Sequence, residues 1–140
     1  MGTFSAKVEA MTKKYQMQMR VVMRDSVQTT VKMAQEIAKE GGRMRVKTGF
    51  LRASVGASIG QMPSGTSINP DPTADEVVFK VDGKAVAATL LRWQPGETLY
   101  VGWTANYARP REARDGFLRG AVERWDETVD LTVIKTKQRI

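Results

Sequence analysis

The sequence predicts an α+β protein: a long N-terminal helix, an antiparallel sheet of about four strands, and a C-terminal helix packed on the sheet. Two observations carry this prediction. Apolar residues recur every three or four positions near both ends of the chain, which indicates helices, and every second position in the middle third, which indicates strands. Helices before and after a run of strands are typical of α+β folds. The 140 residues suit a single domain covering 1–140.

The first element is a helix predicted over residues 5–39. No proline or glycine occurs between Phe4 and Lys39, and Gly41 and Gly42 are expected to end the helix. A helix of this length would span about 50 Å, more than the width of a small domain, so it either breaks or projects. Its apolar stripe is either plain core or, over part of its length, a subunit contact. The stripe consists of Val8, Met11, Tyr15, Met19, Val22, Ser26, Thr30, Met33 and Ile37.

The sheet is predicted within residues 50–105. Alternation indicates strands over 51–59, 77–81 and 99–103. Asp82-Gly83 is a dipeptide favoured in hairpin turns, so Ala85 to Trp93 is either a returning strand or a helix. Residues 94–97, Gln-Pro-Gly-Glu, are predicted to form another turn.

Residues 61–75 are predicted to form an exposed, mobile loop. They contain Pro63, Pro70 and Pro72 among small and polar residues. About fifteen residues is long for a connection between antiparallel strands, and such loops are commonly functional. We expect this loop to be flexible in an isolated subunit and ordered by contacts in an assembled particle.

The C-terminal third is predicted to contain a charged loop over 109–116, a helix over 116–134 and a basic tail over 135–140. The helix is indicated by Phe117, Ala121, Val122, Trp125, Val129 and Val133, which share one face.

Composition excludes several classes of function. The chain has no cysteine, so disulfides and thiolate metal sites are excluded, and no histidine, which removes the commonest general base and metal ligand. We expect no enzyme, no cofactor and no metal. The chain also lacks an apolar run long enough to span a membrane and a hydrophobic leader, so a soluble protein made in the cytoplasm is expected.

The net charge of +7 lies mainly in the first 55 residues, particularly at Arg43, Arg45, Lys47 and Arg52. Such a cluster suits phosphates or an acidic protein face, or it is a solvated turn. The aromatic residues Trp93, Trp103, Tyr100 and Tyr107 suit core and turn positions better than base stacking. Asp71, Asp82 and Lys84 superficially match a metal-dependent nuclease pattern, but they lie in loops and turns, which favours turn chemistry over catalysis.

Three short segments, taken together in their order along the chain, resemble a known family. They are Val46-Lys47-Thr48-Gly49-Phe50-Leu51-Arg52-Ala53-Ser54, then Tyr100-Val101-Gly102-Trp103-Thr104-Ala105-Asn106-Tyr107-Ala108, and finally Gly116-Phe117-Leu118-Arg119-Gly120-Ala121-Val122. This order resembles the neck or tail-completion (head–tail joining) proteins of long-tailed bacteriophages over about residues 30–126. Two departures occur: Arg109-Pro110-Arg111-Glu112 replaces the usual segment after Tyr-Ala, and Gly116 stands where the family commonly has proline.

The resemblance implies a structural virion protein of the phage neck or tail, made in the bacterial host cytoplasm. It implies a homo-oligomeric ring around the DNA channel, a hexamer first and a dodecamer second, between the head connector or stopper protein and the tail terminator or tail tube protein. DNA would pass through without sequence-specific binding. The alternative is a basic nucleic-acid-binding protein. Candidate subunit or partner interface residues are Arg43, Arg45, Lys47, Thr48, Gly49, Leu51, Arg52, Tyr107, Arg109, Arg111 and Arg119.

Overall fold

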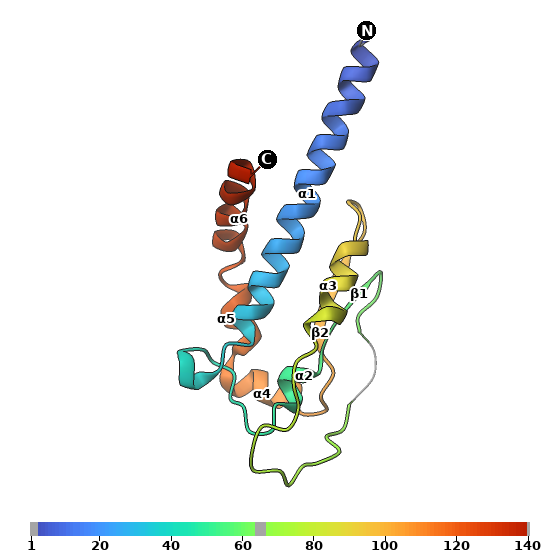
Figure 1. The fold of residues 1–140 in the computed structure, drawn as a ribbon. Helices are drawn as coiled ribbons and strands as arrows, with labels where there is room; N and C mark the ends of the chain where they lie inside the picture. Colours follow the sequence, from blue (N-terminus) through green and yellow to red (C-terminus); the bar gives the residue numbers. More distant parts are fainter. Residues whose placement is uncertain (1–2, 64–66, 140) are drawn as a thin grey trace.

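The fold is organised around one long helix (Figure 1). A computed structural model of the chain describes residues 3–63 and 67–139. In the view of Figure 1, the C-terminal helix lies on one side of the long helix, and a shorter helix with a small sheet lies on the other. In chain order the elements are α1 (Phe4–Ala34), η1 (Ala38–Glu40), α2 (Phe50–Ala53), β1 (Val55–Ile59), α3 (Gly83–Arg92), β2 (Leu99–Trp103), α4 (Ala108–Asp115), α5 (Phe117–Val122) and α6 (Trp125–Arg139).

Helix α1 begins at a capped N-terminus and ends five residues earlier than the sequence predicts. The Thr3 hydroxyl accepts a hydrogen bond of 3.1 Å from the backbone N–H of Ala6, which satisfies one of the free donors of the first turn. The helix ends at Ala34 because Gln35 is buried and leaves helical geometry. The predicted stop at Gly41 instead ends the short η1 turn, where Gly41 has φ 97°.

The sheet is smaller than predicted. Within residues 3–63 and 67–139 it has two strands, β1 and β2, which pair antiparallel with Ala57 opposite Val101, and not about four. The α+β class, the long N-terminal helix and the C-terminal helix are confirmed. The predicted strand over 51–59 is half right, because residues 50–53 form the single turn α2 and the strand begins only at Val55.

The predicted strand at 77–81 and the hairpin turn at Asp82-Gly83 are wrong. Residues 77–81 are extended, but they pair with no strand among the described residues. Asp82 instead caps α3, since its carboxylate accepts a hydrogen bond of 3.0 Å from the backbone N–H of Lys84. The segment from Ala85 onward, for which the sequence left a strand or a helix open, is therefore helical up to Arg92. The turn at 94–97 is confirmed by a 3.1 Å bond from the N–H of Glu97 to the carbonyl of Gln94.

The C-terminal third is more helical than predicted. Residues 108–115 form helix α4 rather than a charged loop, and the predicted helix at 116–134 is divided into α5 and α6. Helix α6 continues to Arg139 through most of the predicted basic tail, while Ile140 lies outside the described residues. Helix α6 packs mainly along α1, so the predicted packing on the sheet holds only for α5, whose Phe117 contacts Trp103 of β2 with ring centroids 5.3 Å apart. Helix α3 packs against β1.

Two buried clusters form the core. One joins the C-terminal end of α1 to α2, β2 and α5, and its largest buried members are Met44, Leu51 and Phe117. The other joins the middle of α1 to α3 and the sheet around Val27, Val86 and Leu90. The contact between α1 and α6 differs from these clusters because its buried α6 side chains are polar. They are three threonines spaced four residues apart, Thr128, Thr132 and Thr136. No helix in the described part of the chain is both long and apolar enough to cross a membrane.

Candidate partner-binding cleft

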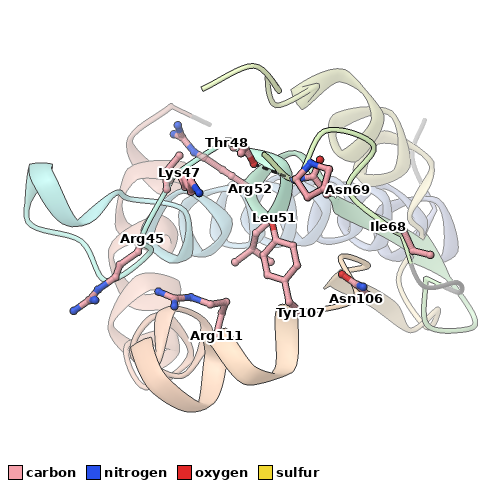
Figure 2. Close-up of a pocket in the computed structure, with 13 residues that line it drawn as sticks. Arg45, Lys47, Thr48, Leu51, Arg52, Ile68, Asn69, Asn106, Tyr107 and Arg111 are labelled. Atoms are coloured by element: carbon pink, nitrogen blue, oxygen red, sulfur yellow. Dashed lines mark hydrogen bonds between the residues drawn. The ribbon is translucent and has the colours of Figure 1, made fainter. Parts of the chain in front are cut away.

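An open cleft of about 490 Å³ lies beside α2 and the start of α4. Three stretches of chain that are far apart in the sequence meet at it: the segment entering α2, the proline-rich loop, and the segment leading from β2 into α4 (Figure 2). We call it the basic cleft. It is lined by Arg45, Val46, Lys47, Thr48, Gly49, Leu51, Arg52, Ile68, Asn69, Pro72, Asn106, Tyr107 and Arg111.

The cleft collects eight of the eleven candidate interface residues and leaves out three. The eight are Arg45, Lys47, Thr48, Gly49, Leu51, Arg52, Tyr107 and Arg111. Arg43 lies elsewhere, with its guanidinium over Gly116 and Gly120 at α5, and Arg119 also approaches Gly116. Arg109 lines a separate hollow beside Met62 and Trp103.

Thr48 is the residue that ties the walls of the cleft together. Its buried hydroxyl accepts hydrogen bonds from the backbone N–H of Phe50 at 3.3 Å and from the side-chain amide of Asn69 at 3.5 Å. Its carbonyl oxygen accepts bonds of 3.0 Å from the N–H groups of Val78 and Phe79. One residue thus fixes the entry to α2, the proline-rich loop and the extended segment before α3.

Gly49 allows the chain to turn into α2 at this point. It has φ 84°, a left-handed conformation that costs little only for glycine. A Cβ atom here would lie 2.5 Å from the carbonyl oxygen of Phe79, so the site excludes any side chain. Close packing of residues 77–79 over the turn therefore depends on glycine at position 49. The same packing is stabilised by an edge-to-face contact between Phe50 and Phe79, whose ring centroids are 5.2 Å apart.

The cleft is strongly cationic. Among the residues that the structure describes, its lining includes two basic side chains from the segment at 45–47, Arg52 from α2 and Arg111 from α4, and it includes no acidic side chain. In Figure 2 these four cations lie on one side of the view, while Asn69 and Asn106 lie on the other. The arrangement suits a carboxylate or a phosphate, the anions that guanidinium groups bind with paired hydrogen bonds.

Part of this charge is already neutralised. Asp115, whose side chain is 7% exposed, contacts Arg111 at 2.7 Å and Arg45 at 3.9 Å. Lys47 and Arg52 make no ion pair within residues 3–63 and 67–139, and the Nε of Arg52 is buried without a hydrogen-bond partner there. Lys47 and Arg52 are therefore the cations of the cleft that remain open to an incoming anion.

The cleft also has an apolar wall. Leu51 is buried beneath it, and Tyr107 lies at its centre in Figure 2. The rings of Tyr107 and Phe50 are 6.2 Å apart, which orients Tyr107 at the start of α4. A ligand that offers both an acidic and an apolar group would therefore match the cleft better than a bare ion.

Sequence reasoning missed the cleft residues from the loop and the acids that position its arginines. Ile68 and Asn69 belong to the predicted loop 61–75, which Ser67 anchors beside the end of β2 through a 2.7 Å bond to the carbonyl of Thr104. Residues 64–66 of that loop lie outside the described residues. Glu112 caps α5 through bonds to the N–H groups of Leu118 and Arg119, at 2.8 and 3.0 Å. A carboxylate five residues before the start of a short helix was the only available signal.

The structure gathers no set of metal ligands in its described part: no three acidic side chains there cluster as a metal ion requires. In particular Asp82, the central residue of the superficial nuclease pattern, is used as the cap of α3.

Comparison with known proteins returned no match: no family model matches the chain, and no curated protein and no solved structure does either.

Proposed function

We propose that the chain is a structural subunit of a phage head-to-tail junction, and that it acts by assembly rather than by catalysis. The observation that carries this proposal is the basic cleft itself. It is built from the ends of two of the segments that resemble the neck and tail-completion family, 46–54 and 100–108, which are separated in the sequence by the loop and α3. Eight of the candidate interface residues line this one open surface.

In this proposal the basic cleft receives an acidic segment of a neighbouring protein. Lys47 and Arg52, the two cations of the cleft that make no ion pair within the described residues, bind its carboxylate, and Tyr107 and Ile68 contact its apolar part. Electrostatic complementarity of this kind sets the orientation and the speed of docking more than its affinity. That is what an assembly step between a few defined partners requires.

The proposed assembly is a closed ring, with a hexamer favoured over a dodecamer. It would lie in the neck or tail of the virion between the head connector or stopper protein and the tail terminator or tail tube protein. DNA would pass through its centre without sequence-specific contacts.

The first experiment measures assembly of the purified protein by light scattering and electron microscopy, alone and with the neighbouring virion proteins. We expect rings. A chain that stays monomeric at high concentration and in the presence of those proteins would contradict the proposal.

A charge-reversal variant tests the cleft. We expect Lys47→Glu to reduce docking of the partner while leaving the fold intact, because Lys47 is exposed and makes no ion pair within the described residues. The matched control is Lys39→Glu, which changes the net charge equally at an exposed position outside the cleft. Equal loss in both variants would show that only net charge matters.

The second candidate function is nucleic-acid binding, favoured by a cleft with four cations and no acid in its described lining. For such a protein the affinity for DNA falls steeply with salt, in proportion to the number of phosphates neutralised. A steep salt dependence that becomes shallower in the Lys47→Glu variant would favour this function. A shallow dependence that is unchanged in the variant would favour the assembly role.

A further inference from the structure

The N-terminal half of α1 makes no packing contact that covers it. Every residue from Thr3 to Met17 is exposed, and in Figure 1 this part of the helix extends beyond all the other elements. An isolated helix of about 15 residues is only marginally stable in water, because most helical stability in proteins comes from packing of an apolar face. A surface that covers this segment is therefore needed to hold it in place.

The exposed segment carries an apolar stripe. Large apolar side chains follow each other at steps of four, three, four and four residues, so they lie on one face of the helix. Their exposed fractions range from 44% to 82%. They are Phe4, Val8, Met11, Tyr15 and Met19.

One border of this stripe is basic. Lys7 and Lys14 are seven residues apart, which places them on the same edge, while Ser5 and Thr12 occupy the opposite edge. Lys13 lies away from the stripe and is already paired with Glu9 at 3.4 Å. An antiparallel pairing of two copies of this stripe brings the lysine edges together without a compensating acid, so the charges disfavour it.

The outer face of α6 has the complementary character. The helix turns Thr128, Thr132 and Thr136 toward α1, which leaves Leu131 and Ile134 exposed on the opposite side, at 50% and 54%. Acidic residues Asp126, Glu127 and Asp130 precede this apolar pair and are all exposed. Lys135 and Lys137 confine the acidic region to the first two turns of α6.

We propose that the free half of α1 docks on the outer face of α6 of a second copy of this chain. The stripe of α1 covers Leu131 and Ile134 of that copy, and Lys7 and Lys14 lie against its Asp126 and Asp130. The contact is between molecules, because α1 is uninterrupted from Phe4 to Ala34 and its second half already packs on the inner face of its own α6. The inference rests on the proposed function and deepens it by naming the subunit interface.

A contact between two different surfaces is heterologous: each copy offers its α1 to one neighbour and its α6 to the other. Repetition of such a contact generates a closed ring when the rotation between copies closes, and a filament when it does not. The basic cleft is left free in this arrangement, so partner docking and ring formation use separate surfaces.

Cross-linking tests the interface directly, because the chain has no cysteine of its own. Chains with Met11→Cys are mixed with chains with Ile134→Cys and treated with a short bifunctional maleimide. We expect a covalent dimer in the mixture and none with either chain alone. The control is Leu91→Cys on α3, 63% exposed, in place of Ile134→Cys; it should give no dimer with Met11→Cys. A cross-link that forms equally with the control would overturn the inference.

Charge exchange supplies the second test. Lys7→Glu with Lys14→Glu should weaken assembly about tenfold or more, and Asp126→Lys with Asp130→Lys should do the same, because each places like charges face to face. Combining the four changes should restore assembly. Failure of the combination to restore it overturns the second copy as the occupant and points to a different protein. If wild-type chains do not assemble at all, the proposed function fails; if they assemble and neither pair of changes matters, only this interface fails.

Discussion

The side chain of Gln35 accepts a hydrogen bond of 3.0 Å from the indole N–H of Trp103, and this bond ties the end of α1 to the end of β2. The two residues are 68 positions apart in the sequence. Trp103 also makes an edge-to-face contact with Phe117, with ring centroids 5.3 Å apart, so the bond orients a ring that connects the sheet to α5.

Replacing Gln35 with leucine should therefore destabilise the fold. The indole N–H would be left without its partner in a partly buried position, which costs about 1–3 kcal/mol in the free energy of unfolding. Urea unfolding measures the loss. Gln28→Leu, at an exposed position of the same helix, is the control and should change stability by less than about 0.5 kcal/mol. Equal stabilities of the two variants would show that the bond contributes nothing.

Gly49→Ala and Gly60→Ala separate backbone strain from steric clash. Both glycines have positive φ, 84° and 88°, so alanine costs about 1–2 kcal/mol at either position. A Cβ meets nothing within 4 Å at Gly60, but lies 2.5 Å from the carbonyl oxygen of Phe79 at Gly49. We expect Gly49→Ala to lose about 1–3 kcal/mol more in denaturant unfolding. Similar losses at both sites would mean that residues 77–79 move away at little cost.

Asp115→Asn should lower the free energy of unfolding by about 1.5–3 kcal/mol. The change removes the charge that holds Arg111 and Arg45 at the C-terminal end of α4. Asp75→Asn, at an exposed position outside the helices, is the matched control. Thermal unfolding of the two variants gives the comparison. A melting temperature of the Asp115 variant as high as that of the control would contradict the anchoring role.

Substitutions at Asp82 test whether its side chain caps helix α3. Asp82→Ala removes the cap of α3 and should cost about 1 kcal/mol, while Asp82→Asn should keep nearly full stability because asparagine caps helices as well as aspartate. Far-ultraviolet circular dichroism and urea unfolding measure helix content and stability. Loss of stability in the asparagine variant alone would argue against the cap.

The loop prediction is tested by limited proteolysis with an enzyme that cleaves beside aspartate, since Asp71 and Asp75 are both exposed. We expect rapid cleavage in the isolated subunit and protection after assembly, because contacts in the particle order the loop. Cleavage at the same rate in both states would refute that prediction.

Periodic apolar patterns predicted those helices and strands that can be identified without knowing what they pack against. The regular apolar spacing predicted α1, and the alternation of Leu99, Val101 and Trp103 predicted β2. Val77 to Val81 alternate in the same way, yet no neighbouring strand of the described chain pairs with them, so alternation alone was insufficient. Asp82-Gly83 suits a helix cap as well as a hairpin, and only the packing of α3 on β1 decides between them.

Eight of the residues that line the cleft were singled out from the sequence, but the shape of the cleft was not predictable. The charge run at 45–52 and the Tyr-Ala segment were visible in the sequence, but their meeting around one cleft depends on contacts such as those of Thr48 with Asn69 and Phe79. Asn69 and Ile68 stand in a loop without any period, so their place in the cleft is set by tertiary contacts alone. The charge pattern of 108–115 suggested a loop, but the Arg111–Asp115 ion pair joins residues four positions apart within helix α4, and Gly116 ends that helix in a left-handed conformation.

The uninterrupted course of α1 gives the molecule a mechanical property. About 15 residues of the helix are free, so a load on Phe4 acts through an arm of roughly 22 Å. The fulcrum is the contact between α1 and the face of α6 that carries its buried threonines. Because Gln35 and Trp103 join the other end of the same helix to β2, we expect a pull on its tip to reach the strand that leads into the basic cleft.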